Sequence, residues 1–302
     1  MPGIRTLLFV ILGLLAVVFF TRWAAQVRSS RGGDEGTIRP SWVETAIGFV
    51  TNFFDTLGIG SFAPTTAVFK LRRVVPDERI PGTLHVGHTP PVIVQAFIFI
   101  AIVQVGVGTL ASLIGASVLG AWLGAGAVAR WPRRRIQLGM GIALLLAATS
   151  FVMSIYGLFP AGGVALSLEG GSFVFAMAGM FVLGALMTLG IGLYAPCMIM
   201  VSLLGMNPTV AFPIMMGASA FLMPVASVRF LAARRYSLGP AVGLAVGGLP
   251  AVLIAAFIVR SLPLNAMRWL VVVVVLYSAI VMLRSAYVEG TVRGGGAPAA
   301  AR

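Results

Sequence analysis

Long runs of apolar residues, each about as long as a membrane-spanning helix, make up most of this sequence. Hydrophobic residues account for 59% of the 302 residues, and charged residues account for only 10%. A water-soluble protein needs more polar side chains than this to cover its surface. Because the backbone must satisfy its own hydrogen bonds in lipid, the runs predict an all-α polytopic membrane protein.

Nine apolar runs divide the chain, and two of them are unusually long. The runs cover residues 6–20, 42–69, 82–105, 106–129, 138–158, 172–204, 209–228, 239–259 and 269–283. The runs 42–69 and 172–204 exceed one simple span and contain Gly and Pro, which interrupt helices. The first run predicts a retained N-terminal helix or signal-anchor over residues 1–24, although two alanines at its end leave cleavage open. Residues 285–302 predict a flexible C-terminal tail.

The two long runs share a motif. Residues 56–64 read TLGIGSFAP, and residues 188–196 read TLGIGLYAP, at an offset of 132 positions. Two proline pairs keep the same offset, at positions 76 and 208 and at positions 81 and 213. Chance similarity between Gly-rich helices is the alternative, but internal repeats are common in transporters. We therefore expect a first repeat over residues 41–158 and a second over residues 172–284.

The basic clusters predict how the repeats are oriented. If each long run crosses once, Arg clusters fall on both faces, against the positive-inside rule. If each run instead breaks at its Gly-Ile-Gly turn and returns, all Lys and Arg except Arg5, Arg260 and Arg268 lie on the cytoplasmic side. This predicts two inverted repeats, each a broken or re-entrant helical hairpin plus three transmembrane helices, with one extra N-terminal helix. The net charge of +13 then serves contacts with membrane lipids rather than nucleic-acid binding.

The paired motifs predict an anion site. Gly permits a backbone turn, and Pro fits the first turn of a new helix. Two helix starts that face each other would offer N–H groups and positive dipole ends to a small anion near the membrane midplane. The alternative is that Gly and Pro merely kink packed helices. The predicted substrate-binding residues are Thr56, Gly58, Ile59, Gly60, Ser61, Pro64, Thr65, Thr188, Gly190, Ile191, Gly192, Tyr194, Pro196 and Cys197.

Ionisable residues inside the apolar runs predict proton coupling. Asp55 precedes the first motif, where a buried carboxylate must be neutral, paired or functional, and its counterpart 132 residues later is Met187. His85 and His88 share a helix face and could relay protons, or else form an interfacial pair. Polar residues that could line a path or bond between helices are Asn52, Gln95 and Gln104.

The sequence predicts neither a metal nor a cofactor. One cysteine, Cys197, excludes an intramolecular disulfide and provides too few thiols for structural zinc. It could contact a soft sulfur-containing substrate, or it could be a small buried hydrophobe. Gly239, Gly243 and Gly247 have the spacing of a close helix contact, which would serve packing within the chain or a homodimer.

At the paired Gly-Ile-Gly…Ala-Pro segments, the chain resembles the TauE/SafE family of sulfite exporters. The resemblance covers residues 42–283 and rests on the duplicated motif, the chain size and the basic loop between the halves. It implies a permease of the cell (inner) membrane for sulfite or organosulfonates. The motif residues that match are Gly58, Gly60, Pro64, Gly190, Gly192 and Pro196. Many members have a longer glycine run than this chain.

Three functions compete at this point. The first is a secondary transporter, and specifically an exporter, of small sulfur-containing anions. The second is a passive anion channel. The third is an intramembrane enzyme or assembly factor that uses Asp55, His85 and His88, but we expect no enzyme because the sequence has no nucleophile–base pairing or metal-ligand spacing. A Walker A sequence is absent from the 302 residues, so ATP-driven transport would need a partner chain.

Overall fold

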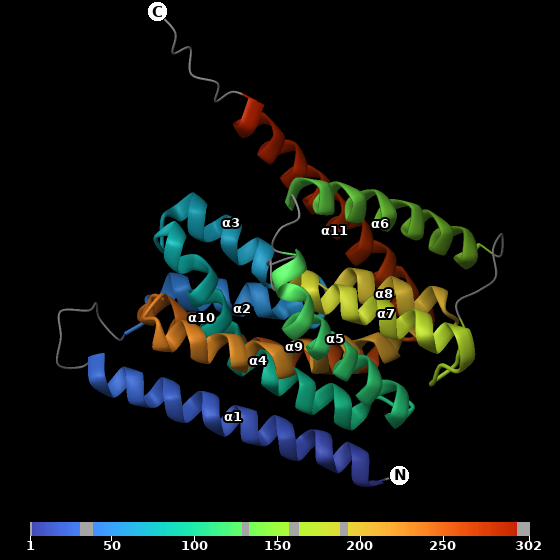
Figure 1. The fold of residues 1–302 in the computed structure, drawn as a ribbon, viewed down its shortest axis with the longest axis horizontal. Helices are drawn as coiled ribbons and strands as arrows, with labels where there is room; N and C mark the ends of the chain where they lie inside the picture. Colours follow the sequence, from blue (N-terminus) through green and yellow to red (C-terminus); the bar gives the residue numbers. More distant parts are fainter. Residues whose placement is uncertain (1, 31–38, 129–132, 157–162, 188–192, 295–302) are drawn as a thin grey trace, which may run out of the picture.

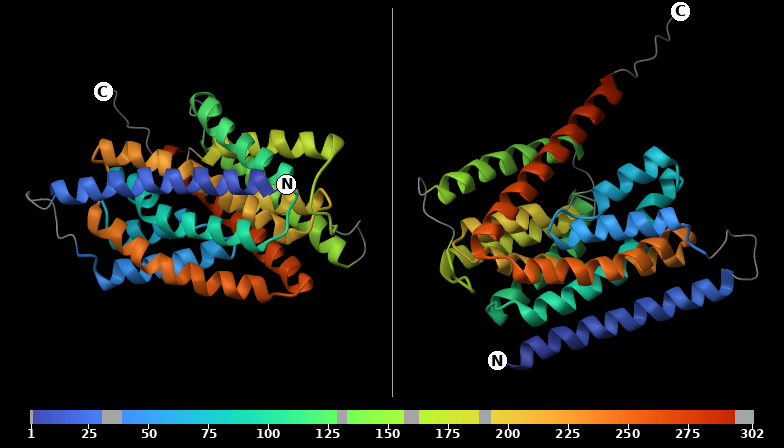
Figure 2. Two further views of the ribbon diagram at one scale, coloured as in Figure 1. Left: turned by 90° about the horizontal axis from the view of Figure 1, so that it is seen from below. Right: turned by 180° about the vertical axis from the view of Figure 1, so that it is seen from behind.

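The protein is helical throughout the part of the chain that the structure places. This computed structural model describes residues 2–30, 39–128, 133–156, 163–187 and 193–294. The helices are α1 (Pro2–Ser30), α2 (Trp42–Thr56), α3 (Phe62–Arg72), η1 (Asp77–Arg79), α4 (Ile80–Ile102), α5 (Val107–Val128), α6 (Arg133–Ile155), α7 (Gly170–Met187), α8 (Tyr194–Leu203), η2 (Pro208–Val210), α9 (Ala211–Ala232), α10 (Leu238–Ser261) and α11 (Leu264–Gly294). Helices α1, α4 and α10 run along the longest axis of the molecule (Figures 1 and 2).

Five of these helices are long and apolar enough to cross a membrane. They cover residues 3–28, 80–102, 170–187, 208–232 and 238–261. Shorter apolar helices accompany them, including α8 (Tyr194–Leu203). The expectation of an all-α protein with several membrane-spanning helices is therefore confirmed.

The first long apolar run forms two helices that meet at a turn. Helix α2 ends at Thr56, and α3 begins at Phe62. Between them Gly58 and Gly60 adopt φ angles of +99° and +86°, which side chains disfavour and glycine permits. Phe69 of α3 packs in one hydrophobic cluster with residues from the start of α4. Helix α3 thus turns back toward the end of the molecule where α4 begins, and α2 and α3 form a hairpin.

The second long run forms α7 and α8. The start of α7 and the end of α8 lie together, next to the end of α4. Ala165, which precedes α7, donates its N–H to Gly205 O at 3.3 Å and accepts from Asn207 N–H at 2.9 Å, just after α8. In the same segment Leu166 O accepts from the N–H of Gly106, which lies between α4 and α5, at 2.7 Å. The two hairpins therefore enter the molecule from opposite ends of α4.

The two halves of the chain contain the same series of elements. The order from α2 to α6 matches the order from α7 to α11, with a 3₁₀ turn at the same place in each. Local hydrogen bonds also recur at the offset of 132 residues. Thr65 N–H bonds Ser61 O as Cys197 N–H bonds Leu193 O, and Val74 N–H bonds Phe69 O as Met206 N–H bonds Val201 O.

Packing between the halves is reciprocal. Helix α2 packs on α10, and its counterpart α7 packs on α5, whereas α4 packs on α9 and α6 on α11. Helices α4 and α9 are antiparallel, because residues from the start of one contact residues from the end of the other. The contacts are Gly82 with Phe230, Thr89 with Ser227 (2.9 Å between hydroxyl oxygens) and Phe99 with Phe212 (5.3 Å between ring centroids).

The two ends of the chain differ in extent from the sequence-based expectation. Helix α1 continues to Ser30 rather than stopping near residue 24, and α11 continues to Gly294, ten residues into the expected tail. Ala286 explains the second extension in part. It is buried, and its carbonyl accepts a hydrogen bond from Arg134 Nε of α6 at 3.2 Å, so α11 remains in contact with the fold beyond residue 284.

Candidate functional site

The turn between α2 and α3 holds a buried carboxylate. Asp55 is 2% exposed, and the N–H of Ser61, the residue before α3, donates to its Oδ1 at 2.6 Å. Gln95 of α4 donates from Nε2 to Asp55 Oδ2 at 2.9 Å and to Thr56 Oγ1 at 2.8 Å. Because the Gly58 turn folds the chain back, Ser61 comes into reach of a carboxylate six residues earlier. Asp55 is thus held by neutral donors.

The same amide leaves an acceptor unused. Gln95 is fully buried, and its Oε1 has no hydrogen-bond partner among the residues that the structure describes. Buried polar atoms are nearly always paired, so an unpartnered oxygen beside a carboxylate marks a place where a hydrogen donor is missing. The amide itself is ordered by the two bonds that its nitrogen makes to α2.

His88 lies next to this group, with one polar partner on each ring nitrogen. Asn52 donates its amide N–H to Gly48 O at 2.7 Å, so its Oδ1 is the atom that faces His88 Nδ1 at 3.1 Å. His88 Nε2 lies 3.1 Å from Thr65 Oγ1, and that hydroxyl donates to Ser61 O at 2.7 Å. The Thr65 hydroxyl can donate either to His88 Nε2 or to Ser61 O, and Ser61 O also accepts the Thr65 N–H, so a neutral His88 with its hydrogen on Nδ1 satisfies these contacts.

The second hairpin reaches the first at this point. A Cβ built on Gly58 would lie 2.7 Å from Met198 Sδ of α8, so the turn and α8 are in direct contact. Tyr194, the first residue of α8, is buried within electrostatic range of Asp55 and hydrogen-bonds Ser219 of α9. The start of α3 and the start of α8 therefore meet near one carboxylate.

Five of the predicted residues that the structure describes belong to the hydrogen-bonded group, and the others lie around it or in the core. Thr56, Ser61, Thr65, Asp55 and His88 are connected by the bonds above. Cys197 is buried in the apolar core near Tyr194, and its N–H bonds Leu193 O. Ile59 packs against the same core. His85 donates from Nδ1 to Pro81 O at 2.8 Å and packs its ring against Phe62 and Phe230.

Four predicted residues cannot be placed. Thr188, Gly190, Ile191 and Gly192 lie outside the described residues. Their neighbours on both sides, Met187 and Leu193, are described. Ser219 Oγ lies 3.9 Å from Met187 Sδ, so the position equivalent to Asp55 faces α9.

The roles of several residues of the site were not predicted from the sequence. Asn52 and Gln95 were expected to line a path or bond between helices, and they are the direct partners of His88 and Asp55. Their signal was a polar amide inside an apolar run. Met198, Met215 and Ser219 gave no signal, because such residues are ordinary in membrane helices, and only the fold brings them to the turn.

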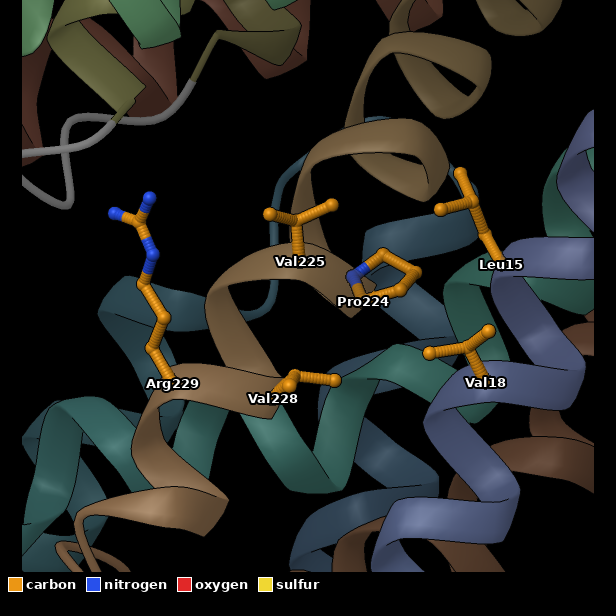
Figure 3. A pocket seen from close by; sticks show the side chains of 6 residues that line it. All are labelled: Leu15, Val18, Pro224, Val225, Val228 and Arg229. Atoms are coloured by element: carbon orange, nitrogen blue, oxygen red, sulfur yellow. The ribbon is translucent and has the colours of Figure 1, made fainter.

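Two surface cavities lie elsewhere. The first has about 260 Å³ and lies between α1 and α9, where Leu15, Val18, Pro224, Val225 and Val228 line it and Arg229 stands at one side (Figure 3). The second has about 720 Å³ and lies beside Arg5 and Gln104, near the N-terminal end of α1. Neither is lined by a residue of the Asp55 group, whose members are closed off from solvent.

The arrangement suits the binding of a proton and of a small anion better than the binding of a metal. It offers one carboxylate, one imidazole and backbone N–H groups at helix starts. Over the described part of the chain, no group of three or more His, Cys, Asp or Glu side chains could hold a metal ion. No protein-family model, no curated protein and no solved structure matches the chain.

Proposed function

We propose that this chain is a secondary transporter, working as an exporter in the cell (inner) membrane, for small sulfur-containing anions such as sulfite or organosulfonates. The observation that carries the proposal is the meeting of two broken-helix hairpins, which enter from opposite ends of α4, at one buried polar group. Transporters built from repeats place their binding sites at such meeting points, near the middle of the membrane.

The two halves are, in this proposal, inverted repeats. The matched order of elements and the recurring hydrogen bonds support a duplication. The antiparallel packing of α4 on α9 supports an inversion, since two equivalent helices that contact each other in opposite directions are related by an axis perpendicular to both. That axis would lie in the membrane plane, as alternating access between two faces requires.

An anion fits the chemistry of the meeting point. The starts of α3 and α8 provide N–H groups and positive dipole ends, which favour a small oxyanion. The resemblance of the glycine–proline motifs to those of TauE/SafE permeases favours sulfite or an organosulfonate. Asp55 and His88 are placed to exchange protons during the cycle, and His85, on the same face of α4, extends this series toward the start of α4.

The test is flux through the purified protein in lipid vesicles, measured for sulfite, sulfate, thiosulfate, sulfoacetate and chloride in turn. We expect saturable flux of sulfite or sulfoacetate. Gly58→Val should abolish it, because the added side chain would meet Met198 at a position with positive φ. Gly13→Val on α1, where a Cβ would meet no atom within 4 Å, should retain it.

Two results would contradict the proposal. If none of the five anions moves under either direction of pH gradient, the chain is not a transporter of this class. If the anions move without saturation and without any response to a proton gradient, the chain is a passive channel instead.

A further inference from the structure

The start of α3, where the proposed function puts a substrate anion, already holds an anion of the protein itself. The N–H of Ser61 donates to Asp55 Oδ1 at 2.6 Å, and the carboxylate is 2% exposed. A carboxylate oxygen and a sulfite or sulfonate oxygen are both negatively charged acceptors, so either can accept a hydrogen bond from this N–H group. Asp55 therefore occupies the position that a transported oxyanion needs.

We propose that Asp55 is an internal anion that holds the substrate's place, so that an anion binds only as Asp55 takes up a proton and leaves the start of α3. This inference rests on the proposed function. Two negative charges at one buried site repel each other strongly, since little solvent is present to screen them. Protonation removes one of the charges and frees Ser61 N–H for the incoming oxyanion.

Gln95 supplies an independent indication that the site takes up a proton. Its Nε2 donates to Asp55 Oδ2 at 2.9 Å, while its Oε1 is buried and finds no partner in the described part of the chain. Rotation of the amide would turn this acceptor toward Asp55, where it would accept the hydrogen of a protonated carboxyl group. Gln95 is thus a positioning residue with one orientation for each protonation state of Asp55.

The surroundings of Asp55 do not provide another charged group that could take up the proton in its place. Tyr194 and Cys197 of α8 are titratable and buried nearby, and His88 of α4 is connected through Thr65 and Ser61. Among the described side chains, the hydrogen-bonding partners of Asp55 are neutral, and α3, α9 and α10 add no charge at bonding distance. The proton that accompanies the anion therefore goes to Asp55.

The second hairpin has no equivalent carboxylate. Met187 stands 132 residues after Asp55, and none of the described side chains caps the start of α8, where Leu193 is the N-cap residue. The start of α3 is thus blocked until Asp55 is protonated, whereas the start of α8 is open. This difference gives one proton for each anion. Because proton and anion stabilise the same bound state, they move in the same direction, and an exchange of one for the other is excluded.

The test uses the purified full-length protein in vesicles with a pH-sensitive dye inside and the membrane potential clamped. Sulfoacetate is added outside at neutral pH, where its charges are fixed and it carries no proton of its own. We expect wild-type vesicles to acidify inside as sulfoacetate enters. In Asp55→Asn the anion should enter without acidification, and Glu44→Gln, which neutralises another carboxylate of α2, should behave as wild type.

The outcomes separate this inference from the proposed function. Sulfoacetate entry with no internal pH change, or with internal alkalinisation, overturns the inference but leaves the transporter. No flux of any anion in wild type overturns both. If Asp55→Asn does not fold, the wild-type affinity for sulfoacetate decides: it should weaken up to about tenfold for each pH unit above the titration of Asp55, and a flat profile contradicts the inference.

Discussion

The hydrogen bonds around Asp55 and His88 connect residues that the sequence singled out for different reasons. Asp55 and His88 stood out as ionisable groups, and Ser61 and Thr65 as donors of the first motif. The structure joins them through Ser61, whose N–H binds Asp55 and whose carbonyl binds Thr65. The sequence could not reveal this, because the bond from Ser61 to Asp55 depends on how sharply the intervening glycines turn.

The partners on α4 were beyond sequence-based reasoning for another reason. Which turn of α4 faces α2 depends on the rotation of two helices that are far apart in the chain and equally apolar around their surfaces. Gln95 and Asn52 were recognised as polar residues in apolar surroundings, but their pairing with Asp55 and His88 required the tertiary packing of α2 against α4.

Gly58 and Gly60 allow a prediction at the scale of one residue. Both have positive φ, so an alanine at either should cost about 1–2 kcal/mol of stability. A Cβ on Gly58 would also lie 2.7 Å from Met198 Sδ, whereas one on Gly60 would meet no atom within 4 Å. We therefore expect Gly58→Ala to lower the thermal unfolding midpoint in detergent more than Gly60→Ala. Equal unfolding midpoints for the two variants would show that α8 does not contact the turn closely at Gly58.

At the scale of elements, glycines decide how closely the hairpins approach the long helices. A Cβ on Gly247 of α10 would lie on the carbonyl of Thr45 of α2, and a Cβ on Gly120 of α5 would lie on the carbonyl of Phe181 of α7. The sequence left open whether such small residues serve packing within the chain or a homodimer. Gly243 and Gly247 contact α2, so these two glycines serve packing within the chain.

Two glycines of α5 give a matched test of this contact. Gly120→Ala should force α5 and α7 apart and destabilise the protein by about 1–3 kcal/mol, the usual cost of overpacking. Gly115→Ala lies on the same helix, where a Cβ would meet no atom within 4 Å, and should stabilise it by about 0.5–1 kcal/mol. Thermal unfolding of both variants measures the difference, and a Gly120→Ala variant as stable as wild type would rule out close packing there.

The helices themselves were largely predictable, because the apolar runs and the breaks within them set where helices can form in lipid. Run 42–69 divides at the turn into α2 and α3, and run 82–105 corresponds to α4. The ends of α1 and α11 were not predictable. Polar and small residues near these ends suggest a loop or a tail, whereas the helices continue along neighbours that the sequence does not identify.

At the scale of the whole molecule, the two ends of α4 should face opposite sides of the membrane. Glu78 precedes α4 and is exposed, and Ser167 is exposed beside Gly106, which follows α4. By the positive-inside rule, the arginine-rich end near Glu78 is cytoplasmic. Ser167→Cys should react with a membrane-impermeant maleimide on intact cells, and Glu78→Cys only after permeabilisation.

The native cysteine does not interfere with this labelling. Cys197 is buried, so the unmodified chain serves as the background control. Labelling of both positions from the same side would mean that α4 does not cross the membrane, and it would remove the basis for an inverted arrangement of the halves.

The reciprocal packing of hairpins and long helices also governs how the chain is made. Helix α2 ends at Thr56, but α10, on which it packs, begins only at Leu238. A ribosome adding about 5–20 residues per second needs on the order of 10–40 s to synthesise the intervening segment. During that interval the nascent α2–α3 hairpin, which contains Asp55, lies in the bilayer without α10 packed against it. The two halves are interlocked, so neither can complete its core alone, and assembly finishes only when the last third of the polypeptide is inserted.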